Sequence, residues 1–202
     1  MQSKMKILVA CEESQAVTIA FRNAGHEAYS CDIQECSGGH PEWHIKGDAI
    51  AEAYSGKYDM MIAHPPCTYI SNAGAVHLYP NKVLSFPRYA LGMEGKKFFM
   101  QLYNAPIEKI MIENPLPSGI FNLPKHTQVI QPFQFGHPFR KRTLLWLKNL
   151  PALVPTNDLG DGQSTKIPGN WYNKGGKERQ KNRSKTFPGI AQAMAEQWGA
   201  LC

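Results

Sequence analysis

The sequence lacks an apolar run that approaches the roughly 20 residues needed to cross a bilayer. Its first residues lead into a strand-like run of about five residues, which is too short for the core of a signal peptide. Cysteine is scarce: the chain has 5, an odd number, scattered rather than spaced as a disulfide framework. We therefore expect a cytoplasmic protein with no membrane partner and with reduced thiols, one of which can serve in chemistry.

Long repeats and low-complexity tracts are also missing. The 202 residues suit one compact domain, residues 1–202, and the 43% of hydrophobic and 19% of charged residues are typical of a globular chain. Residues 151–187 are rich in Pro, Gly, Asn and Lys and show no hydrophobic periodicity. That composition predicts a loop or basic insert rather than a second domain.

Positive charge is concentrated near the end of the chain, whose net charge is +6. The cations of this stretch are Lys174, Lys177, Arg179, Lys181, Arg183 and Lys185, opposed by Glu178 alone. Dense positive charge favours phosphate binding, and Trp171 and Tyr172 just upstream could stack on bases. Lys177, Arg179, Lys181 and Arg183 are therefore candidate nucleic-acid contacts, with a solvated loop that binds no partner as the alternative.

Short apolar runs alternate with helical patterns along the chain. Strands are predicted at residues 6–11, 27–31, 58–63, 107–112 and 143–147, and helices after Ser14 and at residues 87–104 and 190–198. We expect Ser14 to cap the first helix, and Leu91, Phe98, Phe99 and Leu102 to form the core side of the second. This alternation predicts an α/β fold with a doubly wound, mostly parallel sheet.

Chemical side chains follow several of these strands, at the edge where open parallel sheets bind ligands. Asp32 ends the second strand, where an acid typically holds ribose hydroxyls. Cys67 follows two prolines, which stiffen the turn that presents its thiol; a buried structural cysteine is the alternative. Glu113 ends another strand, where burial is expected to raise its pKa so that it can donate a proton; a solvated carboxylate is the alternative.

Two arginines precede the last predicted strand. Arg140 and Arg142 could hold a base carbonyl or a phosphate, or form a surface basic patch. A zinc site is an alternative for another part of the chain, because Cys31, Cys36, His40 and His44 have ligand-like spacing. The first of these lies within a predicted strand and no tight Cys-x2-Cys pair is present, so we favour a loop and no metal.

Three motifs resemble those of the DNA cytosine-5 methyltransferases. Residues 66–74, Pro-Cys-Thr-Tyr-Ile-Ser-Asn-Ala-Gly, are similar to the family's catalytic loop of Pro-Cys, two residues, an apolar residue, Ser, two residues and Gly. Glu113-Asn114 resembles the Glu-Asn-Val motif that touches the target base, and residues 135–142 resemble a Tyr-Gly-x-Pro segment that leads to an Arg-x-Arg pair, one residue shorter. The order holds over most of the chain, which looks like the small phage or prophage members of the family.

The resemblance implies a Rossmann-like S-adenosylmethionine-dependent methyltransferase that acts on carbon 5 of cytosine in DNA. Cys67 would add to carbon 6, and Glu113 would protonate or hydrogen-bond ring nitrogen 3. Arg142, with Arg140, would hold the base carbonyl. Pro66, Ser71 and Asn114 would contact the base, which must be flipped out of duplex DNA. The residues implied for S-adenosylmethionine are Cys11, Glu12, Ser14, Asp32, Asp48 and Pro65.

Two features depart from the family pattern. Where the family has Phe-x-Gly-x-Gly, residues 10–14 read Ala-Cys-Glu-Glu-Ser, without glycine, so that two carboxylates would face the methionine end of the cofactor. The segment after Arg142 is shorter than a usual target-recognition region, which predicts weak sequence specificity or single-stranded DNA as substrate. Alternatives are the same scaffold modifying a nucleotide or RNA, and a non-catalytic binder of nucleic acid or nucleotides; the oligomeric state stays open.

Overall fold

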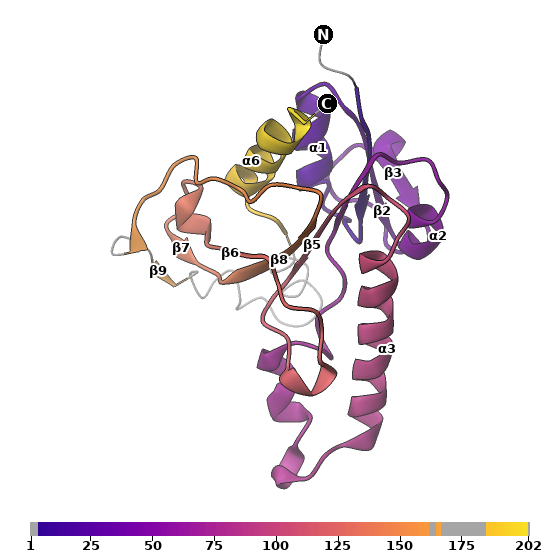
Figure 1. The fold of residues 1–202 in the computed structure, drawn as a ribbon, viewed down its shortest axis with the longest axis vertical. Coiled ribbons are helices and arrows are strands. Elements are labelled where there is room, and N and C mark those ends of the chain that lie inside the picture. The colour runs from indigo at the N-terminus through magenta and orange to yellow at the C-terminus, as the bar shows by residue number, and fades with distance from the viewer. Residues whose placement is uncertain (1–3, 162–164, 167–184, 202) are drawn as a thin grey trace.

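The computed structural model describes residues 4–161, 165–166 and 185–201. Within them, one sheet has seven strands in the order β3-β2-β1-β4-β5-β8-β6 (Figure 1). These strands are β1 Lys6–Ala10, β2 Glu27–Asp32, β3 His44–Lys46, β4 Met60–Ala63, β5 Lys109–Asn114, β6 Gln128–Ile130 and β8 Thr143–Lys148. β1 to β5 pair in parallel, and β8 lies antiparallel between β5 and β6. This confirms the doubly wound, mostly parallel α/β sheet.

Helices cover both faces of the sheet. The α-helices are α1 Ala16–Asn23, α2 Ala49–Ala53, α3 Phe86–Tyr103 and α6 Pro188–Gly199. The shorter elements are 3-10 turns η1 Pro41–Trp43, η2 Asn72–His77, η3 Pro80–Lys82, η4 Gly119–Phe121 and η5 Pro132–Gln134, and a separate strand pair, β7 Phe139–Arg140 with β9 Thr165–Lys166. α1 and α6 pack together on one face, and α2 and α3 pack on the other.

Alternation along the strands explains the two cores. Ile7 and Val9 of β1 face α1 and α6, whereas Leu8 and Ala10 of the same strand face α2 and α3. Because successive side chains of a strand point to opposite faces, a strand buried on both sides reads as a continuous apolar run, which is the pattern found in residues 6–11. None of the helices in the described residues is long and apolar enough to cross a membrane.

The long helix α3 extends beyond the sheet (Figure 1). Its C-terminal half contributes the buried Phe99 and Leu102 to the main core, whereas Leu91, predicted to face the core, is exposed. Beyond the sheet edge α3 joins η2, η3 and η4 in a unit that we call the protrusion, residues 68–93 and 116–123. Ile70, Leu78 and Phe121 form its small separate core. The prediction for Leu91 was wrong because this part of α3 lies beyond the sheet and turns Gly92, not Leu91, toward Phe121 of the small core.

Register brings the predicted chemical residues to one edge. Ala10 pairs with Cys31 of β2 and Ala63 of β4, and Ala63 pairs with Ile112 of β5. The residues that follow these pairs therefore emerge together at the carboxyl ends of parallel strands. This edge is where open α/β sheets bind their ligands.

Candidate active site

Cys67 lies on a tight turn beyond β4. Its carbonyl oxygen accepts hydrogen bonds from the amides of Ile70 (3.2 Å) and Ser71 (2.9 Å), and the residue is half-buried. Gly74 makes this turn possible, since a Cβ at that position would lie 2.8 Å from the carbonyl oxygen of Thr68. The glycine at the end of the Pro-Cys motif therefore has a steric cause in this chain.

The Cys67 turn is tied to the segment that follows β5. The amide of Asn72 donates to the Leu116 carbonyl (2.7 Å), and the amide of Ser118 donates to the Ile70 carbonyl (2.8 Å). Closer to the sheet, the buried Asn114 donates from Nδ2 to the carbonyl of Pro65 at 3.1 Å. The two motifs that carry the cysteine and the glutamate thus hold each other in position, with the side chain of Asn114 as the link at their base.

Glu113 contacts a histidine that the sequence reasoning did not single out. His64 Nδ1 lies 3.2 Å from Glu113 Oε2, and the two side chains are only 7% and 18% exposed. Both residues line a small open cavity together with Lys141, Thr143 and, from the segment leading into α6, Thr186. In the sequence, His64 comes directly after the apolar run of β4 and before two prolines. That strand-end position is the signal that could have identified it.

The charge state of Glu113 differs from the prediction. Burial raises its pKa, as expected, but the hydrogen bond from His64 and the positive charges of Lys141 and His64 together outweigh burial and hold the pKa below its usual value. The expectation of a raised pKa was therefore wrong, because it considered burial without the cations. Glu113 is a carboxylate at neutral pH in this setting.

Lys141, between the two predicted arginines, is a cation that lines the cavity. It lines the cavity with Glu113, and its ammonium lies 5.9 Å from the centre of the Phe187 ring. Arg140 turns away: its Nε donates to Asp161 Oδ1 at 2.8 Å, and its guanidinium also donates to the Asp161 carbonyl. Arg142 is exposed and does not line the cavity. The structure thus brings neither arginine of the Arg-x-Arg pattern to Glu113.

Three of the predicted cofactor residues share a corner of the sheet edge. Cys11 adopts a left-handed conformation, φ 59°, and its amide donates to the Cys31 carbonyl at 2.7 Å. Burial first, and then the charges of Asp32, Cys31 and Asp48, raise the pKa of the Cys11 thiol, so these groups are close together. Asp32 Oδ1 accepts from the amide of Gln34, and Asp48 caps α2 by accepting from the amide of Ile50 at 2.8 Å.

Glu12 has a role that the sequence did not predict. Its buried carboxylate caps α1: Oε1 accepts from the amide of Val17 at 2.7 Å, and Oε2 accepts from the amide and hydroxyl of Thr18 at 3.2 and 2.8 Å. The prediction that Ser14 caps this helix was wrong; Gln15 stands at the cap position in a left-handed conformation and makes no capping bond. The amides at the start of α1, which bind anions in many nucleotide sites, thus face a carboxylate of the chain itself.

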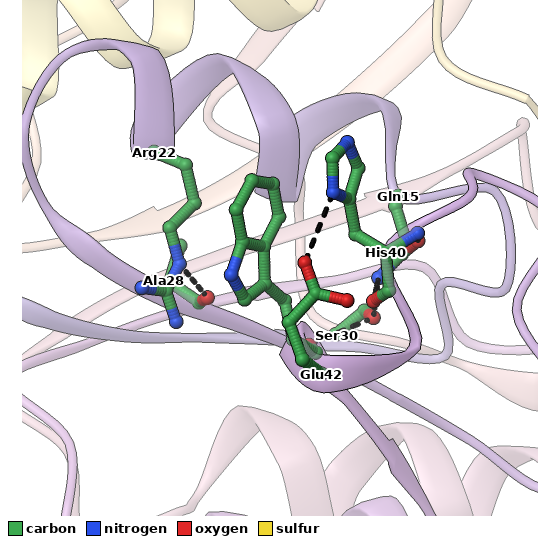
Figure 2. Close-up of polar contacts among 7 residues, drawn as sticks. Gln15, Arg22, Ala28, Ser30, His40 and Glu42 are labelled. Carbon is green, nitrogen blue, oxygen red and sulfur yellow. Dashed lines mark hydrogen bonds and ion pairs between the residues drawn. The ribbon is translucent and has the colours of Figure 1, made fainter.

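The loop after β2 closes over the β1–α1 turn. Gln15 donates from Nε2 to the His40 carbonyl (2.7 Å) and accepts at Oε1 from the His40 amide (3.0 Å), as Figure 2 shows. The ring of Trp43 stacks on His40 at 3.9 Å between centroids, and Arg22 lies over the same ring at 5.1 Å. Gly38 is required here, since a Cβ would lie 2.6 Å from the Ser14 carbonyl oxygen.

The two histidines of the zinc alternative are hydrogen-bonded within this loop and its strands. His44 lies 2.8 Å from Ser30 Oγ through Nδ1 and 2.9 Å from the Gln34 carbonyl through Nε2, and His40 contacts Glu42 (Figure 2). Across the described part of the chain, no three His, Cys, Asp or Glu side chains gather as metal ligands. Of the other predicted contacts, Pro66 is exposed and Ser71 is buried in the Cys67 turn, while Lys177, Arg179, Lys181 and Arg183 lie outside the described residues.

Fold and site together define a Rossmann-like α/β protein whose sheet edge carries a cysteine turn, a histidine–glutamate pair and an acidic corner. The sequence matches no protein-family model and no curated protein. Among solved structures the chain is similar to the S. pombe Dnmt2 methyltransferase, at 14% identity and a TM-score of 0.45, over 74% of this chain and 50% of that one.

Two further solved structures are similar at the same level. One is the Entamoeba histolytica methyltransferase EhMeth, at 13% identity and a TM-score of 0.42, over 86% of this chain and 66% of that one. The other is the bifunctional kinase-methyltransferase WbdD, at 14% identity and a TM-score of 0.39, over 75% of this chain and 36% of that one. The chain thus spans half of the length of the Dnmt2 protein and about a third of WbdD.

Proposed function

We propose that the protein transfers a methyl group from S-adenosylmethionine to carbon 5 of a cytosine in DNA through a covalent adduct on Cys67. The observation that carries the proposal is the junction of the two motifs: the Asn114 side chain bonds to the Pro65 carbonyl, which fixes the Cys67 turn against the end of β5, the strand that carries Glu113. A nucleophile and a carboxylate held on neighbouring strand ends are what pyrimidine activation requires.

The acidic corner fits the nucleoside end of S-adenosylmethionine. Asp32 and Asp48 supply carboxylates beside Cys11, where they would hold ribose hydroxyls and the adenine amine. The start of α1 is capped by Glu12, so the chain would have to bind the carboxylate of the methionine end elsewhere. When bound, the cofactor supplies an electrophilic methyl group.

The residues of the chain would prepare the base for that group. The Cys67 thiolate adds to carbon 6, and Glu113, a carboxylate, accepts a hydrogen bond from the exocyclic amine and orients ring nitrogen 3. Lys141, rather than Arg142, is positioned at the cavity to hold the base carbonyl. The turn stabilised by Gly74 and Ser118 keeps the sulfur at one place relative to the ring.

The test uses DNA that contains 5-fluorocytosine, which traps the cysteine adduct, together with labelled S-adenosylmethionine. We expect a covalent complex that survives denaturation in the wild type and in Cys36→Ala, a matched cysteine variant outside the site, but not in Cys67→Ala. An adduct that persists in Cys67→Ala would reject the nucleophile. Calorimetry that detects no binding of S-adenosylmethionine would reject the donor.

The alternative is that the same site modifies a free nucleotide, RNA or a single strand. Duplex DNA, single-stranded DNA, RNA and a free 5-fluorocytosine nucleotide, each offered at equal concentration, separate these substrates by the rate of adduct formation. Tight binding of nucleic acid without an adduct on any of them would instead indicate a non-catalytic binder.

A further inference from the structure

Two charged groups act on Glu113, and a third acts on its partner His64. His64 at the end of β4 contacts it at 3.2 Å, and Lys141, just before β8, acts on it through its charge. Glu12, in the turn before α1, is close enough to His64 that the two charges interact. The part of the cavity lining that comes from the α6 side, Thr186, Phe187, Ile190 and Met194, carries no charge.

The two ring nitrogens of His64 differ in their hydrogen-bond contacts. Nδ1 pairs with Glu113, whereas Nε2 is buried and, among the described residues, has no hydrogen-bond partner. A buried imidazole nitrogen without a partner is costly, and a ligand in the cavity that forms a hydrogen bond with it would remove that cost. Because the side chain is 7% exposed and lines the cavity, the unfilled position belongs to the site rather than to the surface.

A buried carboxylate seldom stays charged without a neighbouring positive charge or hydrogen-bond donor. Taking Glu113 out of water alone would favour its neutral form, and an imidazolium in hydrogen-bond contact reverses that preference. Imidazole is also the side chain that exchanges a proton near neutral pH, so a histidine–glutamate pair can hold a proton and release it to a third group. Lysine at the same place would hold the carboxylate but would not release its proton near neutral pH.

We propose that His64 positions Glu113 and holds the proton that ring nitrogen 3 of the pyrimidine receives during attack. This inference rests on the proposed function, because it names the proton source of that same site. As the Cys67 sulfur bonds to carbon 6, the ring's electron pair shifts toward nitrogen 3. The Glu113 carboxylate takes the Nδ1 proton of the His64 imidazolium and passes a proton to nitrogen 3, which leaves a neutral imidazole and a carboxylate. When the sulfur leaves again, the proton returns by the same route.

His64→Asn is the informative variant. Its amide can donate to Glu113 from near the position of Nδ1, so the contact survives, but an amide carries no exchangeable charge. The matched control is His126→Asn, since His126 packs edge-on against Trp146 on the opposite, α3 side of the sheet. Both variants are checked for folding by their thermal unfolding before any other measurement.

The first readout does not depend on catalysis. The pKa of the Glu113 carboxyl is followed by NMR titration of side-chain carboxyl carbons, with Glu113→Gln used to assign its signal. In His64→Asn the pKa of Glu113 should rise by about 1 or more, because a cation in contact is lost, and in His126→Asn it should stay at the wild-type value. An unchanged pKa in His64→Asn overturns the proposal, whether or not the protein is a methyltransferase.

The second readout is the pH profile of adduct formation on 5-fluorocytosine DNA. In the wild type the rate of adduct formation should rise and then fall with pH, because the route needs a thiolate on Cys67 and a proton on the His64–Glu113 pair. His64→Asn should lose the alkaline fall and react about 100-fold more slowly. If the pKa of Glu113 shifts in His64→Asn but the wild type forms no adduct, the proposed function and the proton route are rejected, and the effect of His64 on Glu113 is confirmed. If His64→Asn has the same pH profile as the wild type, the proton route alone is rejected.

Discussion

Glu12 shows how one residue can change the character of a binding edge. Many nucleotide-binding sheets leave the first amides of α1 open toward the ligand, with glycines in the preceding turn. In this chain the turn has no glycine, two of its residues adopt left-handed conformations at φ 59°, and the Glu12 carboxylate binds the amides of Val17 and Thr18. Anion binding at that position is therefore performed by the protein itself.

Removing the Glu12 cap should destabilise the fold. Glu12→Ala leaves two buried amides and a hydroxyl without their acceptor, which is expected to lower the free energy of unfolding by about 1–3 kcal/mol. Glu94→Ala, at an exposed position of α3, is the matched control and should change it by less than about 0.5 kcal/mol. Urea unfolding monitored by circular dichroism measures both. Equal effects of the two substitutions would contradict the capping role.

The same residue predicts a pH dependence. Burial raises the pKa of Glu12 by more than the charge of His64 and the amides of Val17 and Thr18 lower it. A carboxyl with a raised pKa binds its proton more tightly in the folded state, so its contribution to stability is largest in acid and is lost as the pH rises from the unfolded value toward the folded one.

The comparison that isolates this effect is wild type against Glu12→Gln, unfolded in urea at a series of pH values between about 4 and 8. The stability of the wild type relative to Glu12→Gln should decrease as the pH rises. A constant difference, or one that grows in favour of the wild type, would show that the pKa of Glu12 is not raised.

Lys141 shows that a sequence motif does not determine which side chain of a segment faces the site. The Arg-x-Arg pattern indicated a cationic segment before the last strand, and the segment is there. In an extended segment, successive side chains point in opposite directions, so the orientation of the segment decides which of them faces the site. With Arg140 bound to Asp161 and Arg142 exposed, it is Lys141 that lines the cavity. No local sequence signal distinguishes the two phases of this alternation.

Whether Lys141 or Arg142 faces the site can be tested directly. Lys141→Met should raise the pKa of Glu113, because a nearby positive charge is removed, and should slow adduct formation by about 100-fold if the ammonium holds the base carbonyl. Arg142→Met, one position along the chain, should leave the pKa of Glu113 unchanged. NMR titration and single-turnover trapping give the two values. The reverse order of effects would restore the arginine assignment.

At the scale of elements, the predicted strands and the predicted helices all coincide with elements of the structure, whereas the short elements β3, β6 and α2 were not predicted. Buried parallel strands are short apolar runs, and all five predicted runs coincide with strands of the sheet, within a few residues at their ends. Helix α3 was also expected, but its hydrophobic residues serve two cores: Phe99 and Leu102 face the sheet, and Gly92 passes so close to Phe121 that a Cβ would overlap its ring. A helix with two partners has no single apolar face to read.

The turn that carries Cys67 depends on one glycine. Gly74→Ala would place a Cβ 2.8 Å from the Thr68 carbonyl oxygen, and backbone must shift to admit it. We expect about 1–3 kcal/mol of destabilisation and slower adduct formation. Gly119→Ala, where a Cβ would meet nothing within 4 Å, is the matched control. Thermal unfolding and trapping rates that are equal in the two variants would show that the turn adapts freely.

At the scale of the whole molecule, the net charge of +6 and the position of the protrusion bear on the proposed nucleic-acid partner. The protrusion extends from the sheet edge that carries Cys67, and it exposes Phe86, 74% accessible, between Lys82 and Arg88 in the sequence. Exposed aromatic rings among cations are the elements of stacking platforms for single strands. The sequence indicated the basic segment near residues 174–185 for this role, but it gave no sign that α3 overhangs the sheet.

Phe86→Ser should therefore weaken the binding of single-stranded DNA by about 5- to 100-fold, the range expected for the loss of one stacked base. Val154→Ser is the control, because Val154 is 64% exposed but lies outside the protrusion, in the segment bonded to α6 through Gln197. Fluorescence anisotropy at several salt concentrations measures both. Since Phe86 is uncharged, its loss should lower the affinity at every salt concentration without changing the slope against salt. If the two variants bind equally, the strand does not cross the protrusion, and the basic segment would be the remaining candidate for its contacts.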